Sequence, residues 1–325
     1  PTSAVLPASA APPRLADAHG RVLRKLRVSL TDACQYRCFY CMPEHATFSR
    51  PETLLRPDEY HAICGELVAR GIEELRITGG EPTVRPEFRA IVTLLAQLPA
   101  RLALTSNGQL LERHLEFLKD VGCTRLNISV DSLDPGRFGR ITHGGDLRTV
   151  LGCIDRAAAL GFRLKVNAVV FRGINDDELG DFARWSAATG IEVRFLEYMK
   201  IGPEHARTFE RFVAADEMIA ALRTQSGFDL RPVAVPHDST SFVFDTPEGA
   251  RLGFIASESK PFCGACSRLR LSATGVLRAC LMREDGLSLR GVAPDAYDGI
   301  LPRVLALKPT GRLHHVDQAM HEIGG

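Results

Sequence analysis

The sequence predicts an α/β protein whose core is a parallel sheet, followed by a smaller C-terminal region. Six apolar, β-branched runs alternate with segments of helical periodicity, and successive βα units form parallel sheets with right-handed crossovers. Polar and glycine-rich motifs directly follow these runs, as expected where the carboxyl ends of parallel strands carry a site. The alternation stops near residue 228. Periodicity alone does not separate an open doubly wound sheet from a partial barrel.

The six βα units occupy most of the first two thirds of the chain. The expected strands are Lys25–Leu30, Glu74–Thr78, Leu102–Thr105, Arg125–Val130, Leu164–Val170 and Glu192–Tyr198. The expected helices are Asp58–Arg70, Pro86–Leu98, Leu110–Val121, Leu147–Leu160, Asp176–Thr189 and Ala214–Ser226. Two further β-like runs, Ser241–Asp245 and Arg251–Ile255, flank a turn in the C-terminal region. We therefore expect a flexible tail over 1–20, a sheet unit over 21–227 and a cysteine-containing region over 228–325.

Composition restricts the classes of function. The chain has 325 residues, is 45% hydrophobic and carries a formal net charge of +1, so it has no overall field that would attract nucleic acid or an anionic membrane. Nine cysteines, an odd number with short spacings, favour metal binding in a reducing compartment over a disulfide framework. No apolar stretch of the sequence approaches the roughly 18 residues of a membrane helix. We therefore expect a cytoplasmic protein that binds neither nucleic acid nor membrane.

The first chemical motif is a cysteine triad, Cys34, Cys38 and Cys41, which follows the first expected strand and has Tyr40 before its last thiol. Clusters of the 4Fe–4S type usually take four cysteines, so three leave one iron open. An open coordination position is what a metal site needs for chemistry. The alternative is a structural zinc knuckle, for which His45 could supply a fourth ligand. The spacing, the preceding strand and Tyr40 favour the iron–sulfur interpretation.

A second triad consists of Cys263, Cys266 and Cys280. Taken alone, this spacing favours zinc, with His237 or a C-terminal histidine completing a tetrahedral site. Three thiolates also suit an open-iron cluster, so the residues leave both interpretations open. The remaining cysteines lie on or beside expected helices and are predicted to be buried packing residues. They are Cys64, Cys123 and Cys153.

Basic residues form a further candidate group. Arg27, Arg76 and Lys165 fall within three expected strands, and Arg268 and Arg270 follow the second triad. A basic residue inside a buried parallel strand is unusual. Each one alone could be a surface charge or half of a structural ion pair. Together at one barrel mouth they would bind a triphosphate, because Arg can donate two hydrogen bonds to phosphate oxygens.

Two glycine pairs have both an ordinary and a functional interpretation. Gly79 and Gly80 follow the second expected strand, where a plain turn is the ordinary explanation, although Gly also permits a close backbone approach to a ligand. Gly324 and Gly325 end the chain. A terminal glycine pair is usually frayed, but it is also thin enough to enter a narrow site.

Together these motifs resemble the radical S-adenosylmethionine (SAM) superfamily and, within it, the GTP 3′,8-cyclase family, which acts first in molybdenum cofactor biosynthesis. The resemblance runs from about Leu15 to the C-terminus. The motifs that carry it are the segment 26–32, the first triad with Cys41-Met42-Pro43, the segments 76–82, 105–108, 127–131, 165–167 and 172–176, the second triad, and Ile323-Gly324-Gly325. The resemblance implies a partial (β/α)6 TIM-type barrel with a smaller C-terminal cluster-binding region. It also implies that the second triad holds a 4Fe–4S cluster.

The resemblance assigns residue roles by motif. The first triad would hold the cluster that cleaves SAM, and the second triad would hold the other cluster. The SAM pocket would contain Tyr40, Gly80, Ser129 and Met199. GTP would contact Arg27, Arg76, Thr105, Lys165 and the segment Arg268-Leu269-Arg270. Arg268, Arg270, Gly324 and Gly325 are also expected to take part in catalysis.

The implied reaction is a radical cyclisation catalysed by a lyase. Reductive cleavage of SAM would give a 5′-deoxyadenosyl radical that removes the ribose C3′ hydrogen of GTP. Closure between C3′ and C8 would give 3′,8-cyclo-7,8-dihydro-GTP. The expected partners are GTP, a low-potential electron donor and the next enzyme of molybdopterin synthesis, for a monomer or homodimer. The alternatives are a radical SAM peptide maturase with an auxiliary cluster and a non-catalytic zinc protein.

Overall fold

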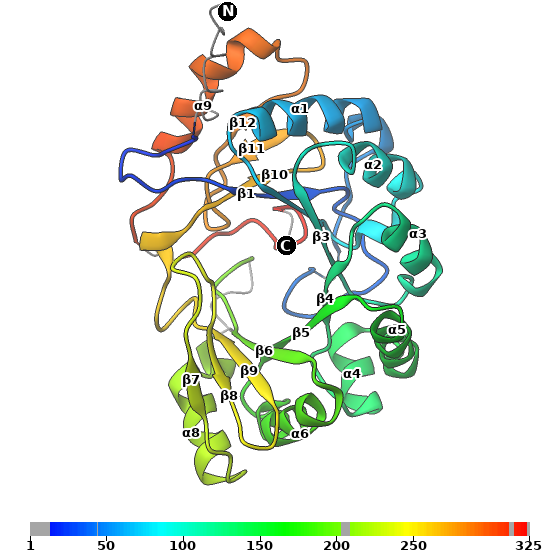
Figure 1. Cartoon of the computed structure of the whole chain (residues 1–325), viewed down its shortest axis with the longest axis vertical. Coiled ribbons are helices and arrows are strands. Elements are labelled where there is room, and N and C mark those ends of the chain that lie inside the picture. Colours follow the sequence, from blue (N-terminus) through cyan, green and yellow to red (C-terminus); the bar gives the residue numbers. More distant parts are fainter. Residues whose placement is uncertain (1–13, 44, 203–208, 312–314, 324–325) are drawn as a thin grey trace, which may run out of the picture.

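In the computed structural model, residues 14–43, 45–202, 209–311 and 315–323 are described, and they form one curved sheet with helices on its outer face (Figure 1). Within these ranges the sheet has twelve strands, in the order β12-β11-β10-β1-β2-β3-β4-β5-β6-β9-β8-β7. The six central strands are β1 (Lys25–Ser29), β2 (Glu74–Thr78), β3 (Arg101–Ser106), β4 (Arg125–Ser129), β5 (Arg163–Val170) and β6 (Glu192–Glu197). Adjacent central strands pair in parallel. The predicted parallel sheet is therefore confirmed, and each predicted strand is within one residue of the observed bounds.

The helices cover the outer face of the sheet (Figure 1). They are α1 (Pro57–Ala69), α2 (Phe88–Leu95), α3 (Leu115–Asp120), α4 (Pro135–Thr142), α5 (Leu147–Ala159), α6 (Leu179–Thr189), α8 (Ala215–Thr224) and α9 (Tyr297–Ala306). Sequence analysis missed α4. Its start signals are present, since Asp134 accepts a hydrogen bond from the Arg137 amide at 2.6 Å and Pro135 occupies the first turn. Gly136 and Gly139 weaken its helical pattern.

The C-terminal region extends both ends of the barrel sheet. Its strands are β7 (Arg231–Val233), β8 (Phe242–Asp245), β9 (Arg251–Ile255), β10 (Arg268–Leu271), β11 (Val276–Arg278) and β12 (Leu287–Ser288). β9 pairs in parallel with β6, and β10 pairs in parallel with β1. These pairings satisfy the backbone hydrogen-bonding groups that the six central strands would otherwise leave open at their edges. They also place the second triad, which flanks β10, beside the strand that precedes the first triad.

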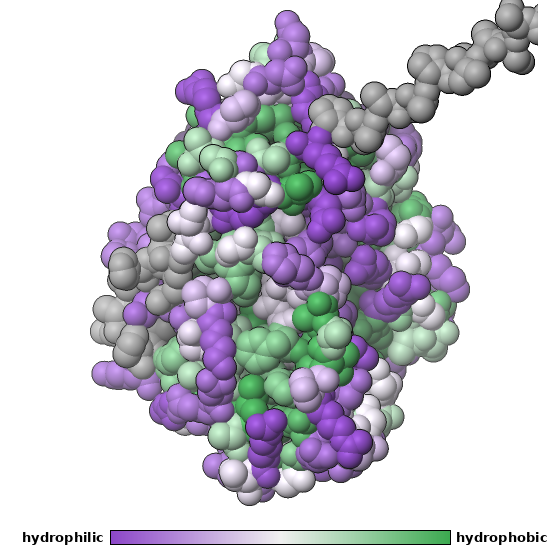
Figure 2. Space-filling view, turned by 60° about the vertical axis from the view of Figure 1, so that its left-hand side comes forward, coloured by the Kyte–Doolittle hydropathy of each residue, from purple (hydrophilic) through white to green (hydrophobic). Residues whose placement is uncertain are grey.

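The barrel remains open between the two ends of the sheet (Figure 1). Hydrophilic residues cover much of the face viewed in Figure 2, and hydrophobic residues gather in its lower half.

Within the described residues, no helix has the length and apolar character to cross a membrane.

The core lies between the sheet and the outer helices. Apolar residues of the central strands pack there, as do Cys64, Cys123 and Cys153, whose side chains are fully buried. The prediction that these three cysteines are packing residues is therefore confirmed.

Both ends of the described chain are held against the barrel. Within the predicted N-terminal tail, the Leu15 amide donates to the Arg70 carbonyl and the Leu15 carbonyl accepts from the Leu23 amide. The buried Asp17 carboxylate pairs with Arg21 at 2.5 Å. Residues 14–20 are therefore part of the fold. Residues 1–13 lie outside the described residues.

Candidate active site

One cavity inside the barrel, of about 650 Å³, brings together nearly every residue that the sequence singled out. The predicted site residues that line it are Cys34, Cys38, Cys41, Cys263, Cys266, Cys280, Tyr40, Gly80, Ser129, Met199, Arg27, Arg76, Thr105, Lys165, Arg268 and Arg270. They come from strands β1 to β5 and β10, from the loops after β1, β2, β6 and β11, and from the loop before β10. Both cysteine triads and the basic group therefore face the same space.

The loop that carries the first triad is packed against the Gly79–Gly80 turn. The Gly80 amide donates to the Thr31 carbonyl at 2.7 Å. A Cβ on Gly79 would lie 2.5 Å from the Thr31 oxygen, and one on Gly80 would lie 2.3 Å from the Ala33 oxygen. Real Cβ atoms essentially never come so close to backbone atoms. The glycine pair therefore sets how closely the β2 turn approaches the cysteine loop, which a plain turn would not require.

Glu81 ties this turn to the end of β3. Its carboxylate is fully buried and accepts hydrogen bonds from Thr83, from the Ser106 hydroxyl at 3.0 Å and from the Asn107 amide at 2.7 Å. The Asn107 side-chain amide in turn donates to the Cys34 sulfur at 3.6 Å. Burial raises the pKa of Glu81. From the sequence, Glu81 was recognised only as part of a motif. Its contacts with Ser106 and Asn107 form only because the ends of β2 and β3 lie side by side in the fold.

The thiols of the first triad lie in a low-dielectric environment. Burial raises the pKa of Cys34 to about 11 and that of Cys41 to about 12, and it raises the pKa of Cys38 well above its usual range. Thiolate, not thiol, is the form that binds a metal. A cluster held by these cysteines would therefore supply the positive charge that stabilises three thiolates here.

The second triad has cationic neighbours. Burial tends to raise the pKa of Cys266, but Arg268 and Lys308 outweigh it and lower this pKa to about 7. The Lys308 ammonium donates to the Cys266 sulfur at 3.4 Å, to the Arg268 carbonyl at 2.7 Å and to the Ala279 carbonyl at 3.0 Å. The buried lysine thereby connects the two cysteine-bearing loops that flank β10 and β11. These contacts favour the thiolate form of Cys266.

The donor sets of both triads fit iron–sulfur clusters. All six sulfurs are free thiols in partly exposed residues. In the described part of the chain, no three His, Cys, Asp or Glu side chains converge on a point suited to a single metal ion. A four-iron cluster is larger than one ion and takes each cysteine on a different iron, so its ligands need not converge in that way. His237, considered as a zinc ligand, is exposed and does not line the cavity.

The arginines of the basic group lie on the adjacent strands β10, β1 and β2, and Lys165 lies on β5. Arg27 on β1 is in register with Arg76 on β2 and with Arg270 on β10. Burial lowers the pKa of Arg270 to about 10, and burial, with the other arginines, lowers the pKa of Arg27 well below its usual value. The cavity therefore holds a concentration of positive charge that a bound anion would stabilise.

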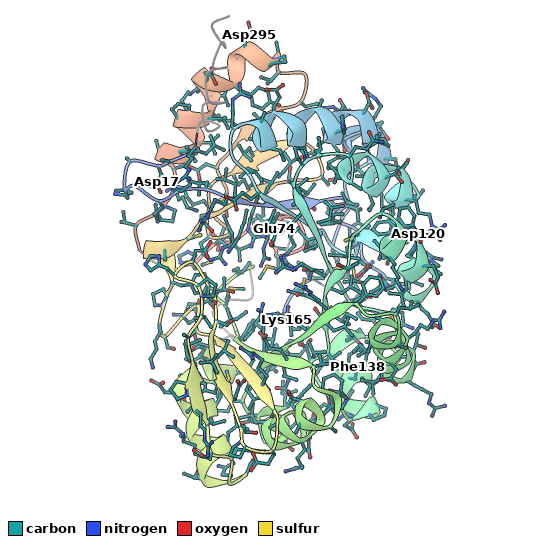
Figure 3. All side chains as sticks on the ribbon, in the orientation of Figure 1. Asp17, Glu74, Asp120, Phe138, Lys165 and Asp295 are labelled. Atoms are coloured by element: carbon teal, nitrogen blue, oxygen red, sulfur yellow. The ribbon has the colours of Figure 1, made fainter. Side chains whose placement is uncertain are left out.

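Two carboxylates pair with part of this charge. Glu74 lies 3.2 Å from Arg76, and Glu192 lies 2.7 Å from Lys165 and 2.6 Å from Arg194. Glu74 on β2 and Lys165 on β5 both lie beside the barrel interior (Figure 3). Arg76 and Lys165 line the cavity while paired with these carboxylates. Phosphate oxygens could contact them there.

Among the arginines that line the cavity, two have a buried nitrogen that lacks a hydrogen-bond acceptor. These nitrogens are Nη1 of Arg76 and Nη2 of Arg268, and neither has a partner within the described residues. The Arg268 guanidinium also lies over the Phe262 ring, 4.9 Å from its centroid. Buried donors are nearly always paired in proteins. The unpaired donors therefore indicate where an anionic ligand would bind.

The candidate SAM pocket contains a buried tyrosine–carboxylate pair. The Tyr40 hydroxyl donates to Asp131 at 2.7 Å, and the other oxygen of Asp131 accepts from the Val169 amide at 2.9 Å. The Tyr40 ring packs against Phe171 and Tyr198, with centroid distances of 5.1 and 6.4 Å. The position of Tyr40 is thus determined by residues that follow β4, β5 and β6.

The charged residues of the cavity that were not predicted from the sequence include Arg194, Arg21 and Lys308. Arg194 lies inside β6 and could have been found by the criterion applied to Arg27, which was a basic residue within an apolar strand. Arg21 donates to the Cys263 carbonyl at 2.8 Å, and Lys308 contacts Cys266. Neither carries a sequence signal, because each contact joins residues more than 40 positions apart.

One predicted contact does not fit the strand geometry. The Leu269 side chain is fully buried in the core and does not line the cavity. Successive residues of a strand face opposite sides, so Arg268 and Arg270 face the cavity and Leu269 does not. Gly324 and Gly325 lie outside the described residues.

The residues before the terminal glycines close over the cavity mouth. Val316 pairs with Ile201 in a short parallel bridge, and Ile323 packs against both. Met320 lines the cavity itself. Residues 315–323 therefore cover the end of β6 and the loop after Cys280.

Comparison with known proteins decides the family. Residues 28–186 match the family model described as Radical SAM superfamily, and residues 191–304 match the one described as Molybdenum Cofactor Synthesis C. The chain is 44% identical to a GTP 3′,8-cyclase of Synechocystis sp., over 96% of this chain and 95% of the relative. It is 38% identical to a GTP 3′,8-cyclase of Aquifex aeolicus, over 85% and 87%. The chain belongs to the GTP 3′,8-cyclase family. Membership of the radical SAM superfamily implies a 4Fe–4S cluster and SAM.

Solved structures agree with this family at the level of the fold. Streptococcus suis SuiB bound to its precursor peptide SuiA has a TM-score of 0.64, with 13% identity over 89% of this chain and 68% of that one. At that identity the likeness concerns the fold alone. It confirms the radical SAM fold and does not favour a peptide substrate for this GTP 3′,8-cyclase family member.

Asp131→Asn should make the stability of the metal-free protein less dependent on pH. Burial raises the pKa of Asp131 to about 6 from an ordinary value of 3.8. Between these two values the folded state binds more protons than the unfolded state, so stability falls as pH rises and then levels off above about 6. The difference between these two pKa values corresponds to roughly 3 kcal/mol in the free energy of unfolding. We expect the variant to be more stable than wild type at pH 7.5 and equal to it near pH 3.5.

Chemical denaturation at several pH values measures this difference. The amide can still accept from the Val169 amide, and its NH2 group can donate to the Tyr40 hydroxyl. Asp134→Asn, which changes a carboxylate at an exposed helix start, is the control. Parallel stability curves for Asp131→Asn and wild type across pH 4 to 7 would contradict the role assigned to burial.

Proposed function

We propose that this protein converts GTP into 3′,8-cyclo-7,8-dihydro-GTP by radical SAM chemistry, as the first step of molybdenum cofactor biosynthesis. The observation that carries the proposal is the shared cavity, which is lined by two cysteine triads and a group of arginines. The relatives at 44% and 38% identity bear the name GTP 3′,8-cyclase. Each half of the cavity then has a separate task.

Cys34, Cys38 and Cys41 hold the first 4Fe–4S cluster. When bound, this cluster and SAM supply the 5′-deoxyadenosyl radical that removes the C3′ hydrogen of GTP. The protein's part is positional. Gly80, Ser129 and Met199 line the SAM pocket together with Tyr40, whose hydroxyl is held by Asp131.

Cys263, Cys266 and Cys280 hold a second 4Fe–4S cluster next to the substrate. The support is that these thiols line the same cavity as the first triad and that Arg268 and Lys308 favour the thiolate of Cys266. A cluster held by three cysteines keeps one iron open, and that iron would bind the guanine base.

The GTP triphosphate binds to the basic group. Arg27, Arg76, Arg268 and Arg270 come from the adjacent strands β10, β1 and β2, Lys165 comes from β5, and all five line the cavity. Thr105, at the end of β3, adds a hydroxyl donor. Arginine pairs with phosphate through two parallel hydrogen bonds, which fixes the ribose relative to the SAM pocket.

The C-terminal segment excludes water from the cavity. Met320 lines the cavity and Ile323 is buried beside Val316. Gly324 and Gly325 follow directly and are proposed to complete the site. A carbon radical reacts with whatever is nearest, so a closed cavity protects the cyclisation.

The remaining parts of the proposal concern the cellular setting. A cytoplasmic location agrees with nine free thiols. The division near residue 227 into a barrel and a C-terminal region agrees with the end of the βα alternation after α8. The product passes to the next enzyme of molybdopterin synthesis, and an external donor supplies electrons.

An anaerobic assay tests the function. The reconstituted protein receives dithionite, SAM and GTP, and mass spectrometry follows 5′-deoxyadenosine and a cyclised GTP product. We expect both, and we expect 5′-deoxyadenosine formation to increase with GTP. Deoxyadenosine without any change in GTP would reject GTP as the substrate. Neither product, from protein with about eight irons per chain as two four-iron clusters require, would reject the radical SAM function.

A further inference from the structure

A second pocket lies outside the barrel, behind the loop of the first triad. Its volume is about 470 Å³, and it shares no lining residue with the inner cavity. We call it the α4 pocket. Its basic and apolar lining residues are Phe39, Arg137, Arg140, Ile141, His143, Ile174 and Arg211. The function proposed above uses none of them.

The α4 pocket has an excess of positive charge. Arg140, His143 and Arg211 are exposed, and in the described part of the chain neither arginine forms an ion pair. The Arg137 guanidinium is satisfied by Asp177 at 2.6 Å and by Glu178 at 2.5 Å. Two arginines therefore remain available to an acidic partner.

The floor of the α4 pocket is one residue from a cluster ligand. Phe39 stands between Cys38 and Tyr40 in the sequence. Its ring lies 5.7 Å from the Tyr40 ring and 4.9 Å from the Phe171 ring, and the Arg211 guanidinium lies 5.3 Å from its centroid. Tyr40 faces the inner cavity. Aromatic rings thus connect the outer pocket with the loop that carries the first triad.

Helix α4 fixes the pocket relative to that loop. The Arg37 amide donates to the Thr142 carbonyl at 2.9 Å, and the Phe39 amide donates to the Ile141 carbonyl at 3.4 Å. These backbone bonds hold the last turn of α4 on the cysteine loop. A partner that binds Arg140 would therefore be held at a fixed distance from Cys38.

We propose that the α4 pocket is the docking surface for a small acidic electron-transfer protein that reduces the first cluster. The proposal rests on the proposed function, because SAM cleavage consumes one electron from outside. SAM and GTP fill the inner cavity, so the electron enters from the other side of the cysteine loop. The partner loses one electron and the cluster gains one, and the transfer makes or breaks no bond and moves no proton.

Charge complementarity is the reason for choosing an acidic protein. Exposed arginines at a rim attract an acidic surface and raise the rate of encounter more than the final affinity. This suits a donor that must dissociate after each transfer. Phe39, at the floor of the pocket, provides an apolar contact inside the basic rim, and interfaces commonly combine an apolar centre with a polar rim.

Stopped-flow reduction of the reconstituted protein by reduced flavodoxin, a small acidic flavoprotein, tests the proposal. The variant is Arg140→Gln with Arg211→Gln. Its matched control is Arg303→Gln, an exposed arginine on α9, far from α4 (Figure 1). At low salt we expect the double variant to be reduced at least about tenfold more slowly than wild type and the control. The wild-type rate should fall as salt increases.

Dithionite separates the docking site from the chemistry. It is a small reductant that needs no docking surface, so it should reduce all three proteins equally and support equal product formation. Flavodoxin-driven reduction of the double variant at the control rate would overturn the α4 docking surface alone. Failure of wild type to form product with dithionite would overturn the proposed function instead.

Binding measurements give an independent readout. Isothermal titration with oxidised flavodoxin should show binding to wild type and at least about tenfold weaker binding to the double variant. If inorganic phosphate binds the α4 pocket while flavodoxin does not, the pocket is an anion site and the docking proposal is wrong.

Discussion

Gly80→Ala is expected to abolish formation of 5′-deoxyadenosine almost completely. The new Cβ would lie 2.3 Å from the Ala33 carbonyl oxygen and 2.6 Å from that of Asp32. Both are backbone atoms of the loop that leads to Cys34, so relief of the clash requires movement of the loop. A misplacement of about 1 Å can reduce a rate by about 100-fold. We expect at least that loss for SAM cleavage, whether or not GTP is present.

A control separates this effect from a general effect of alanine. Gly152 lies in α5, where a Cβ would meet nothing within 4 Å. Gly152→Ala should therefore keep full activity and gain about 0.5–1 kcal/mol of stability from the better helix propensity of alanine. Circular dichroism and iron content establish that both variants fold and bind iron. A Gly80→Ala protein with wild-type SAM cleavage would show that the close approach of the two loops is not needed.

Arg268→Ala is expected to weaken GTP binding by roughly 10- to 100-fold and leave SAM binding nearly unchanged. The Nη2 atom of Arg268 is buried without an acceptor, so a triphosphate oxygen would satisfy it. A hydrogen bond between charged groups contributes about 1.5–3 kcal/mol, which corresponds to this range. Anaerobic equilibrium dialysis with labelled GTP and labelled SAM measures both affinities.

Two further variants test why Arg268→Ala weakens GTP binding. Arg268→Lys keeps the charge but loses the two-pronged geometry, so it should fall between wild type and alanine. Arg231→Ala removes an exposed arginine that pairs with Asp229 outside the cavity and should have no effect. Because Arg268 also lowers the pKa of Cys266, the iron content of each variant is measured in parallel. Equal loss of GTP and SAM binding at full iron content would contradict the assignment.

The sequence predicted the central sheet well because its signals are local. Each of the six strands is a short apolar run bounded by polar residues, and its bounds were found to within one residue. Helix α4 was missed because Gly136 and Gly139 weaken its pattern, although its start signals are present. Strand β10 was missed although charged and apolar residues alternate in Arg268–Leu271, because the run is only four residues long and directly follows the cysteine loop.

Individual residues of the site also show that contacts between residues near in sequence can be predicted and contacts between distant residues cannot. Cys34, Cys38 and Cys41 are close in sequence, so their common role was visible at once. Nothing local identified Lys308 as a neighbour of Cys266, because the contact spans 42 positions. Leu269 was grouped with its neighbours until the strand placed its side chain in the core.

The sequence by itself determined the βα alternation, the two cysteine triads and the presence of basic residues within strands, because these depend on neighbouring positions in the chain. Only the tertiary structure decided that the second triad joins the first in one cavity. That outcome follows from β10 pairing in parallel with β1, between residues more than 240 positions apart. Such a pairing is determined by backbone hydrogen bonds and burial in the folded chain, and no short stretch of sequence encodes it.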